Sequence, residues 1–149
     1  MAWALVVAQF GLLLLLVLLP TGSLWATGVL TWVLGGVLVI TGISLVAIAG
    51  FGLGRSLTPL PIPKSDGELV TDGLYRFARH PIYTGVLITA CGLLLSGASL
   101  GHLFAVTALY VVLTTKAHFE EKLLALRFST YGAYARATGR FFPRLPRRA

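Results

Sequence analysis

Residues 81–116 read PIYTGVLITACGLLLSGASLGHLFAVTALYVVLTTK, and the first Asp, Glu, Lys or Arg in this stretch is Lys116 at its end. A membrane-spanning helix needs about 20 apolar residues, with a range of roughly 17–25. The small residues of Ser96-Gly97-Ala98-Ser99 favour a tight turn in the middle of the stretch. The sequence therefore predicts a hairpin of two membrane spans, 81–97 and 99–116.

The N-terminal part of the chain predicts two more spans, because residues 1–54 contain no Asp, Glu, Lys or Arg. The first apolar run ends before Pro20-Thr21-Gly22 and lacks the basic start and the A-x-A site of a signal peptide, so we expect a retained helix. The prediction is an all-α, polytopic membrane protein that forms a single domain over residues 1–149. Its expected parts are spans at 1–19, 24–50, 81–97 and 99–116, a loop at 51–80, and a tail at 117–149 with an interfacial helix.

Composition supports this class. The 149 residues are 56% hydrophobic and 11% charged, whereas soluble domains carry about 25% charged residues. The mean hydropathy of +0.86 excludes a soluble globular domain and intrinsic disorder. A single cysteine excludes a disulfide framework. The sequence contains no cluster of Cys and His that would predict a metal site.

The charged residues lie in two blocks, which sets the expected topology. Residues 55–79 carry four basic and three acidic side chains, and residues 116–149 carry eight basic and two acidic ones. Four spans place both blocks on one side, and the positive-inside rule makes that side cytoplasmic. We therefore expect a multi-pass protein of the cell (inner) membrane with both termini in the cytoplasm.

The tail mixes aromatic residues with arginines, as in STYGAYARATGRFFPRLPRR at 129–148. Beside a membrane, this composition predicts an interfacial anchor that favours anionic lipid. The expected partner of the basic charge is thus the lipid bilayer and not nucleic acid.

The second span carries Gly28, Gly35, Gly42 and Ala49, each seven residues after the previous one. Seven residues are nearly two helical turns, so these four positions share one face. Small residues let membrane helices approach closely. We expect this stripe to pack against a neighbouring helix.

Polar residues gather at the charged end of the hairpin. His80 and Tyr83 lie at the start of one span, where Pro81 suits the first helical position, and Glu120 and Glu121 follow the other span. A hairpin brings these ends together. Two carboxylates, a histidine and the positive end of a helix dipole predict a site for a zwitterion.

The residues alone leave a structural interpretation open. A pair of glutamates after a span is often a solvated face, and a histidine before a proline is often a helix cap. His102, near the opposite end of its span, is interpreted as structural.

Two segments resemble the isoprenylcysteine carboxyl methyltransferase (ICMT) family, which is related to the membrane phospholipid N-methyltransferases. LVTDGLYRFARHPIYTG at 69–85 is similar to the family run L-V-x-x-G-x-Y-x-x-x-R-H-P-x-Y-x-G, and EEKLLALRFSTYGAYARATGRFFP at 120–143 is similar to its E-E-x-x-L-x-x-x-F-x-x-Y-x-x-Y segment. LGRSLTPLPIP at 53–63 resembles the linker of short bacterial members. The resemblance covers roughly residues 53–146.

The resemblance implies S-adenosylmethionine as the methyl donor, with S-adenosylhomocysteine as the product, in a pocket that faces the cytoplasm. Lys116 stands where eukaryotic members have an arginine toward the substrate carboxylate, which places it, with Glu121, on the substrate side. Lysine lacks the bidentate fork of arginine, which weakens the implied carboxylate substrate. The residues implied to contact the cofactor are Gly67, Glu68, Leu69, Val70, Tyr75, His80, Pro81, Tyr83 and Glu120.

The expected function is methyl transfer to a lipophilic small molecule or lipid, with O-methylation of a carboxylate as one form. An anionic nucleophile needs no strong base, whereas an amine would need one, for which Glu121 or His80 are candidates. Two alternatives remain open at this point: an amine-methylating phospholipid enzyme and a non-catalytic membrane scaffold.

Overall fold

The computed structural model describes residues 2–63 and 67–144, and within them the regular structure is helical, without a β-strand. Four long helices are α1 (Ala2–Leu18), α2 (Val29–Leu53), α3 (Pro81–Gly97) and α4 (Leu100–Arg127). Short elements complete the chain: the 3-10 helices η1 (Gly54–Ser56) and η2 (Gly73–Arg76), and the helix α5 (Tyr131–Ala137). Residues 64–66 of the loop predicted at 51–80 fall outside the described residues.

Two of the long helices meet the length and composition needed to cross a membrane, over Val29–Ser56 and Leu100–Arg127. The other two, α1 and α3, are apolar helices of 17 residues each. The all-helical fold is thus confirmed, whereas the number of spans remains a prediction.

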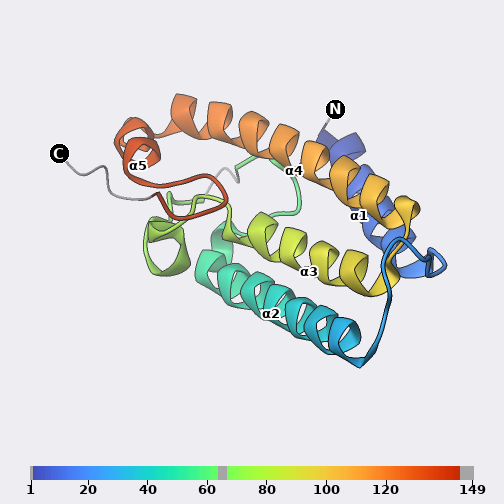
Figure 1. Ribbon diagram of the computed structural model, residues 1–149. Coiled ribbons are helices and arrows are strands. Elements are labelled where there is room, and N and C mark those ends of the chain that lie inside the picture. Colours follow the sequence, from blue (N-terminus) through green and yellow to red (C-terminus); the bar gives the residue numbers. More distant parts are fainter. Residues whose placement is uncertain (1, 64–66, 145–149) are drawn as a thin grey trace.

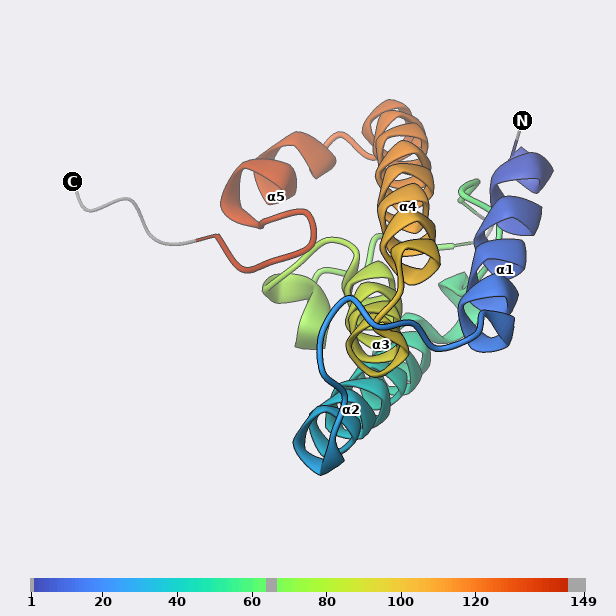
Figure 2. The ribbon, with the colours of Figure 1, turned by 45° about the vertical axis from the view of Figure 1, so that its right-hand side comes forward.

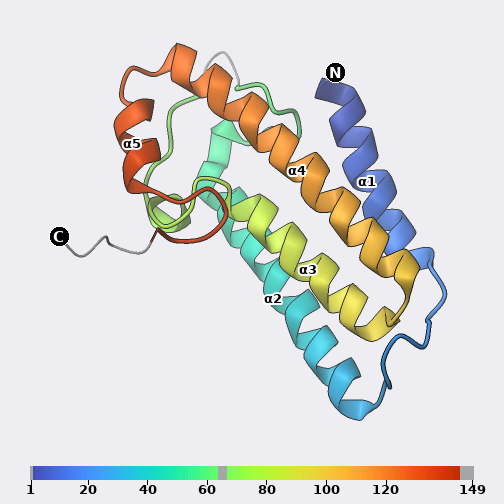
Figure 3. The ribbon, with the colours of Figure 1, turned by 45° about the horizontal axis from the view of Figure 1, so that its top comes forward.

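The order in which the helices lie side by side differs from their order along the chain. Helix α3 lies between α2 and α4, and α1 packs against α4 (Figure 1, Figure 2). The view in Figure 3 shows all four long helices and the short α5 beside the far end of α4. Both α1 and α2 expose large apolar side chains over much of their length, as expected of helices that face lipid.

The start predicted for the second span, residue 24, is wrong, because α2 begins at Val29. Gly28 caps the helix, where the Thr31 hydroxyl accepts from Gly28 N at 2.8 Å. The residues before it form an irregular segment that is hydrogen-bonded to the α3–α4 turn. There Gly22 N donates to Gly97 O at 2.7 Å and Leu24 N donates to Ala98 O at 2.9 Å.

The glycine stripe packs α2 against α3, apart from its first member. Gly35, Gly42 and Ala49 are buried, whereas a Cβ on Gly28 would meet nothing within 4 Å. On the partner helix, Gly85 and Gly92 approach so closely that a Cβ on either would lie 2.6 Å from a carbonyl oxygen of α2. Small residues on both helices therefore bring the two backbones together.

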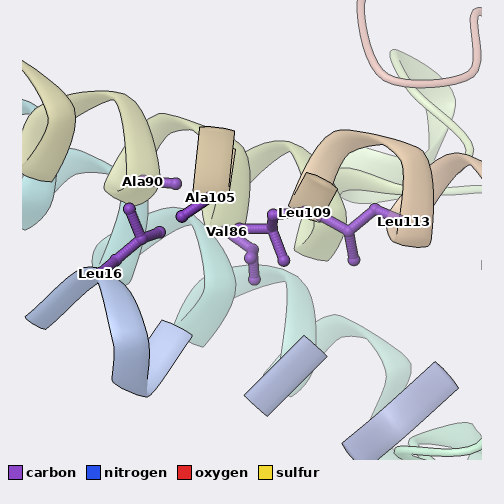
Figure 4. Close-up of a cluster of buried hydrophobic side chains, with 6 residues drawn as sticks. All are labelled: Leu16, Val86, Ala90, Ala105, Leu109 and Leu113. Atoms are coloured by element: carbon purple, nitrogen blue, oxygen red, sulfur yellow. The ribbon is translucent and has the colours of Figure 1, made fainter. Parts of the chain in front are cut away.

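A core cluster joins α1, α3 and α4 (Figure 4). Its buried members are Leu16, Val86, Ala90, Ala105, Leu109 and Leu113. The cluster holds the hairpin against α1 and so fixes the relative position of the helix ends that carry the polar residues.

The predicted turn between α3 and α4 is confirmed. Ala98 adopts a left-handed conformation with φ of 44°, and Ser99 caps α4 by accepting a hydrogen bond from His102 N at 3.2 Å. The Ser99 hydroxyl also lies 2.7 Å from His102 Nδ1. His102 is thus part of the cap, as interpreted from the sequence.

Replacing Ser99 with alanine removes this cap and is expected to cost about 1 kcal/mol of stability. The measurement is the thermal midpoint of unfolding of the purified protein in detergent. The matched control is Ser23→Ala, in the exposed segment before α2. Equal midpoints for the two variants would contradict the proposed role of the cap.

Candidate functional site

The four polar residues expected to converge do so at one end of the hairpin. The Tyr83 hydroxyl donates to Glu120 Oε2 at 3.0 Å, and His80 lies between the two glutamates. Its Nδ1 is 3.6 Å from Glu120 Oε2 and its Nε2 is 3.2 Å from Glu121 Oε1. The His80 and Tyr83 rings stack with centroids 5.2 Å apart.

Glu121 is surrounded by cations. Arg79 donates through Nε to Glu121 Oε1 at 3.0 Å, and Arg140 donates through Nη2 to Glu121 Oε2 at 2.8 Å and through Nε to Oε1 at 3.0 Å. These hydrogen bonds favour the ionised carboxylate, and the bond to Glu121 raises the pKa of Arg140 above its ordinary value. Both oxygens of Glu121 therefore serve to hold neighbouring residues in place.

The tail reaches this cluster through backbone hydrogen bonds. Arg79 N donates to Gly139 O at 2.8 Å, and His80 N donates to Arg140 O at 3.0 Å. The Thr84 hydroxyl donates to Phe141 O at 2.6 Å. The sequence predicted only an interfacial anchor here, and a basic residue among aromatics gives no sign that its backbone will pair with a distant segment.

Arg79 has further partners on the tail. Its Nη1 donates to Ala135 O at 2.9 Å and also to Thr138 O. One guanidinium thus links the start of α3, the end of α4 and α5. Arg79 and Arg140 were not among the predicted site residues, although Arg79 belongs to the quoted motif.

A cavity of about 460 Å³ opens beside this cluster, within the range of roughly 300–1,000 Å³ that is usual for small-molecule sites. Its lining comes from all four long helices, the loop after α2, and α5. Of the eleven predicted site residues, Pro81 and Glu121 do not line the cavity. Those that do are Gly67, Glu68, Leu69, Val70, Tyr75, His80, Tyr83, Lys116 and Glu120.

The loop wall of the cavity is held by polar contacts. The Ser56 hydroxyl accepts from Glu68 N at 3.1 Å, and Arg127 Nη2 donates to Gly67 O at 2.9 Å. These contacts tie Gly67 and Glu68 to η1 and to the end of α4. An irregular segment is thereby kept in place without secondary structure of its own.

Tyrosines form another part of the wall. The Tyr75 hydroxyl donates to Ala49 O at 3.3 Å, and the Tyr134 hydroxyl donates to Tyr75 O at 2.6 Å. Burial raises the pKa of Tyr134 to about 12. Burial and the nearby Glu120 carboxylate raise the pKa of Tyr75, and burial likewise raises the pKa of Tyr131. The phenols thus remain protonated near neutral pH, and those of Tyr75 and Tyr134 donate hydrogen bonds.

Lys116 lies on the cavity wall with 2% of its surface exposed. Its Nζ donates to Gln9 Oε1 at 2.6 Å and lies 3.4 Å from Pro59 O. It also lies 5.1 Å from the centroid of the Tyr83 ring. Gln9 was missed from the sequence, where it is an isolated polar residue in an apolar helix.

Within residues 2–63 and 67–144, no three side chains of His, Cys, Asp or Glu are grouped so that they could hold a metal ion. The cavity wall carries carboxylate, ammonium, imidazole and phenol groups.

Comparison with known proteins matches residues 24–131 to a family model described as phospholipid methyltransferase. This match covers α2, α3, α4 and the first residue of α5, and begins after α1. It therefore includes the cavity wall from Val46 to Tyr131.

Two curated relatives carry names of metal-resistance proteins. The cobalt-zinc-cadmium resistance protein CzcN of Cupriavidus metallidurans is 39% identical over 84 residues, which are 55% of this chain and 38% of that protein. The nickel-cobalt-cadmium resistance protein NccN of Alcaligenes xylosoxydans xylosoxydans is 33% identical over 118 residues, which are 77% of this chain and 54% of that protein. The matches thus span about half the length, or less, of these relatives.

Proposed function

The chain belongs to the phospholipid methyltransferase family, and we propose from this that it is an integral membrane methyltransferase that uses S-adenosylmethionine. The proposed acceptor is a lipophilic small molecule or lipid. The observation that carries the proposal is the cavity at the hairpin end, because it combines Glu120, His80, Lys116 and a wall of tyrosines.

The groups in the cavity fit the chemistry of the cofactor. S-adenosylmethionine carries an ammonium, a carboxylate, a ribose, an adenine ring and a sulfonium. Glu120 offers a carboxylate suited to the ammonium or the ribose hydroxyls, and the rings of Tyr75 and Tyr134 suit an aromatic base or a cation. The residues that would hold the cofactor are Gly67, Glu68, Leu69, Val70, Tyr75, His80, Tyr83 and Glu120, with Pro81 starting the helix behind them.

When bound, the cofactor supplies an electrophilic methyl group on its sulfonium. The protein then has to position the acceptor, exclude water and orient its own polar groups. The Glu121 cluster serves orientation, because it fixes His80 through a 3.2 Å contact while Arg79 and Arg140 hold Glu121 itself. We therefore assign Glu121 a positioning role, which leaves His80 as the candidate base for an acceptor that must lose a proton.

Topology forms part of the proposal. We place α1 to α4 across the membrane, with the Arg-rich end that holds the cavity on the cytoplasmic side and both termini there. The exposed apolar faces of α1 and α2 would meet lipid, so a lipophilic acceptor could enter from the bilayer.

Equilibrium binding of S-adenosylmethionine to the purified full chain in detergent tests the proposal. We expect saturable binding by the parent and a loss of at least about tenfold in both Glu120→Ala and His80→Ala, since each removes a polar group from the cavity wall. Asp72→Asn is the matched control, because its side chain is exposed and lies outside the cavity. A well-folded parent that binds no S-adenosylmethionine in detergent or in bilayers would favour a non-catalytic scaffold.

Product analysis separates the two kinds of transfer. Methyl esters from O-methylation are base-labile, whereas the methylamines of a phospholipid N-methyltransferase are not. Radiolabel from the methyl donor that is released by mild base would support an oxygen acceptor, and base-stable label in a lipid headgroup would support a nitrogen acceptor.

A further inference from the structure

His118 lies on α4 and is exposed, yet both nitrogens of its ring are within hydrogen-bond distance of a partner. Nδ1 lies 2.8 Å from Thr114 O, one helical turn earlier on α4. Nε2 lies 3.0 Å from Arg140 Nη1, which belongs to the tail. The imidazole therefore connects α4 to the tail, although it does not line the cavity.

The two partners determine which ring nitrogen carries the proton. A backbone carbonyl only accepts hydrogen bonds, so Nδ1 of His118 donates to Thr114 O. A guanidinium only donates, so Nε2 accepts from Arg140 Nη1, which lies farther, at 3.5 Å, from Nδ1. Contact between α4 and the tail at this point thus requires a neutral imidazole with its proton on Nδ1.

Arg140 uses the other side of its guanidinium on the candidate site. Its Nε and Nη2 donate to the two oxygens of Glu121, which leaves Nη1 for His118. Glu121 Oε1 lies 3.2 Å from His80 Nε2, and Arg140 O accepts from His80 N. Figure 1 shows the tail, in red, returning from α5 to the start of α3. A change at Arg140 therefore reaches His80 by two routes.

Protonation of His118 would reverse the sign of its contact with Arg140. A proton on Nε2 would face the N–H groups of the guanidinium, and two cations would lie 3.0 Å apart. Among unperturbed side chains, imidazole is the one that changes charge between pH 5 and 8. The contact thus holds while His118 is neutral and is lost as the pH falls and Nε2 gains a proton.

The other ionisable groups around this contact do not replace it. They are Arg79 before α3, Tyr83 of α3, Tyr131 of α5, and Tyr110, Glu120, Glu121 and Lys122 of α4. Both anions among them are already hydrogen-bonded, Glu121 to the two arginines and Glu120 to Tyr83. Helix α1 packs against α4 but carries no titratable side chain. A charge that appears on His118 is therefore met chiefly by the cation of Arg140.

We propose that His118 is a positioning residue of the candidate site, whose neutral imidazole holds Arg140 on Glu121 and whose protonation loosens the tail from the start of α3. The effect on S-adenosylmethionine rests on the proposed function, because it reaches the cofactor through His80. The docking of the tail itself can be measured without any ligand.

The ring state of His118 can be read from the nitrogen chemical shifts of the full chain, labelled with 15N-histidine and held in detergent. The chain has three histidines, and His118→Gln identifies the signals of this one. We expect the tautomer with the proton on Nδ1 at pH 7.5. The tautomer with the proton on Nε2 would overturn the inference, because it cannot accept from Arg140.

Hydrogen exchange of the Arg79 and His80 amides measures the docking of the tail, because these amides donate to Gly139 O and Arg140 O. Between pH 7.5 and 5.5, we expect their protection in the parent, corrected for the intrinsic effect of pH, to fall at least about threefold, which is the scale of an exposed charged contact. His118→Gln retains an acceptor oxygen and does not titrate, so its protection should stay within about twofold over this range. His118→Arg carries a permanent charge and should show the low protection of the acidic parent at both pH values.

Two comparisons complete the test. Ala125→Arg is the matched control, because it adds the same charge at an exposed position two turns further along α4, and it should behave as the parent. The Kd of the parent for S-adenosylmethionine should rise by at least about threefold between pH 7.5 and 5.5, whereas that of His118→Gln should stay within about twofold.

Each contrary outcome has its own meaning. An equal fall of protection in the parent and in His118→Gln would overturn the inference, as would full protection of His118→Arg at pH 7.5 or an equal loss in Ala125→Arg. A Kd of the parent that does not change with pH would also overturn it, since His118 would then act on the tail and not on the site. A parent whose tail loosens as expected but that binds no S-adenosylmethionine at either pH would retain the contact with the tail and reject the proposed function.

Discussion

Replacing Glu121 with alanine is expected to destabilise the folded protein by about 3 kcal/mol or more. Removing one partner of a buried ion pair leaves the other charges uncompensated, at a cost of roughly 3–5 kcal/mol. The Glu121 side chain is 14% exposed and accepts from two arginines and faces one histidine. The partial exposure of Arg140 places the expected value at the low end of that range.

The neighbouring glutamate supplies the control. Glu120→Ala removes one hydrogen bond from Tyr83 and the longer contact to His80, so we expect a loss of about 1 kcal/mol. Thermal unfolding of both variants in detergent measures the difference. A Glu121→Ala midpoint as high as that of Glu120→Ala would show that the arginine cluster does not support the fold.

The second large effect is expected from leucine at Gly42. A Cβ on this residue would lie 2.5 Å from Gly85 O and 2.6 Å from Thr89 N, both of which are backbone atoms of α3. A rotamer change cannot relieve a clash with backbone, so the two helices must separate. Overpacking typically costs 1–3 kcal/mol, occasionally more, and we expect Gly42→Leu to exceed the upper end of that range because it separates the most extensive helix contact of the fold.

Gly36 is the matched control for this substitution. It lies on the same helix, but a Cβ there would meet nothing within 4 Å, and leucine is a better helix former than glycine. Gly36→Leu should therefore leave the thermal midpoint unchanged or raise it. A folded Gly42→Leu protein with the midpoint of the parent would contradict the close packing of α2 and α3.

The sequence was sufficient to predict the helical fold and the meeting of four polar side chains. Long uncharged runs predict helices, and a short turn forces the two ends of a hairpin together, so His80 and Tyr83 had to approach Glu120 and Glu121. These inferences depend on local patterns and on chain connectivity, both of which can be read directly from residue order.

Features that depend on non-local pairing were not predicted. Arg140 was interpreted as a lipid anchor, because the sequence does not show that Gly139 and Arg140 pair with Arg79 and His80. The glycine stripe was recognised on α2, but its partners Gly85 and Gly92 on α3 were not, since no pattern specifies which helix lies opposite. Gln9 was missed for the same reason.

The docking of the tail onto the start of α3 has a consequence for the order in which the molecule is completed. Residues 79 and 80 are synthesised about 60 residues before their backbone partners at 139 and 140, which corresponds to roughly 3–12 s at 5–20 residues per second. In the proposed topology, α1, α2 and α3 can enter the bilayer during that interval, while the amides of Arg79 and His80 and the Arg79 guanidinium still lack the tail. A nascent chain arrested before residue 139 should therefore be inserted in the membrane while its cavity is still incomplete. Membrane insertion and completion of the cavity are then separate events in its biogenesis.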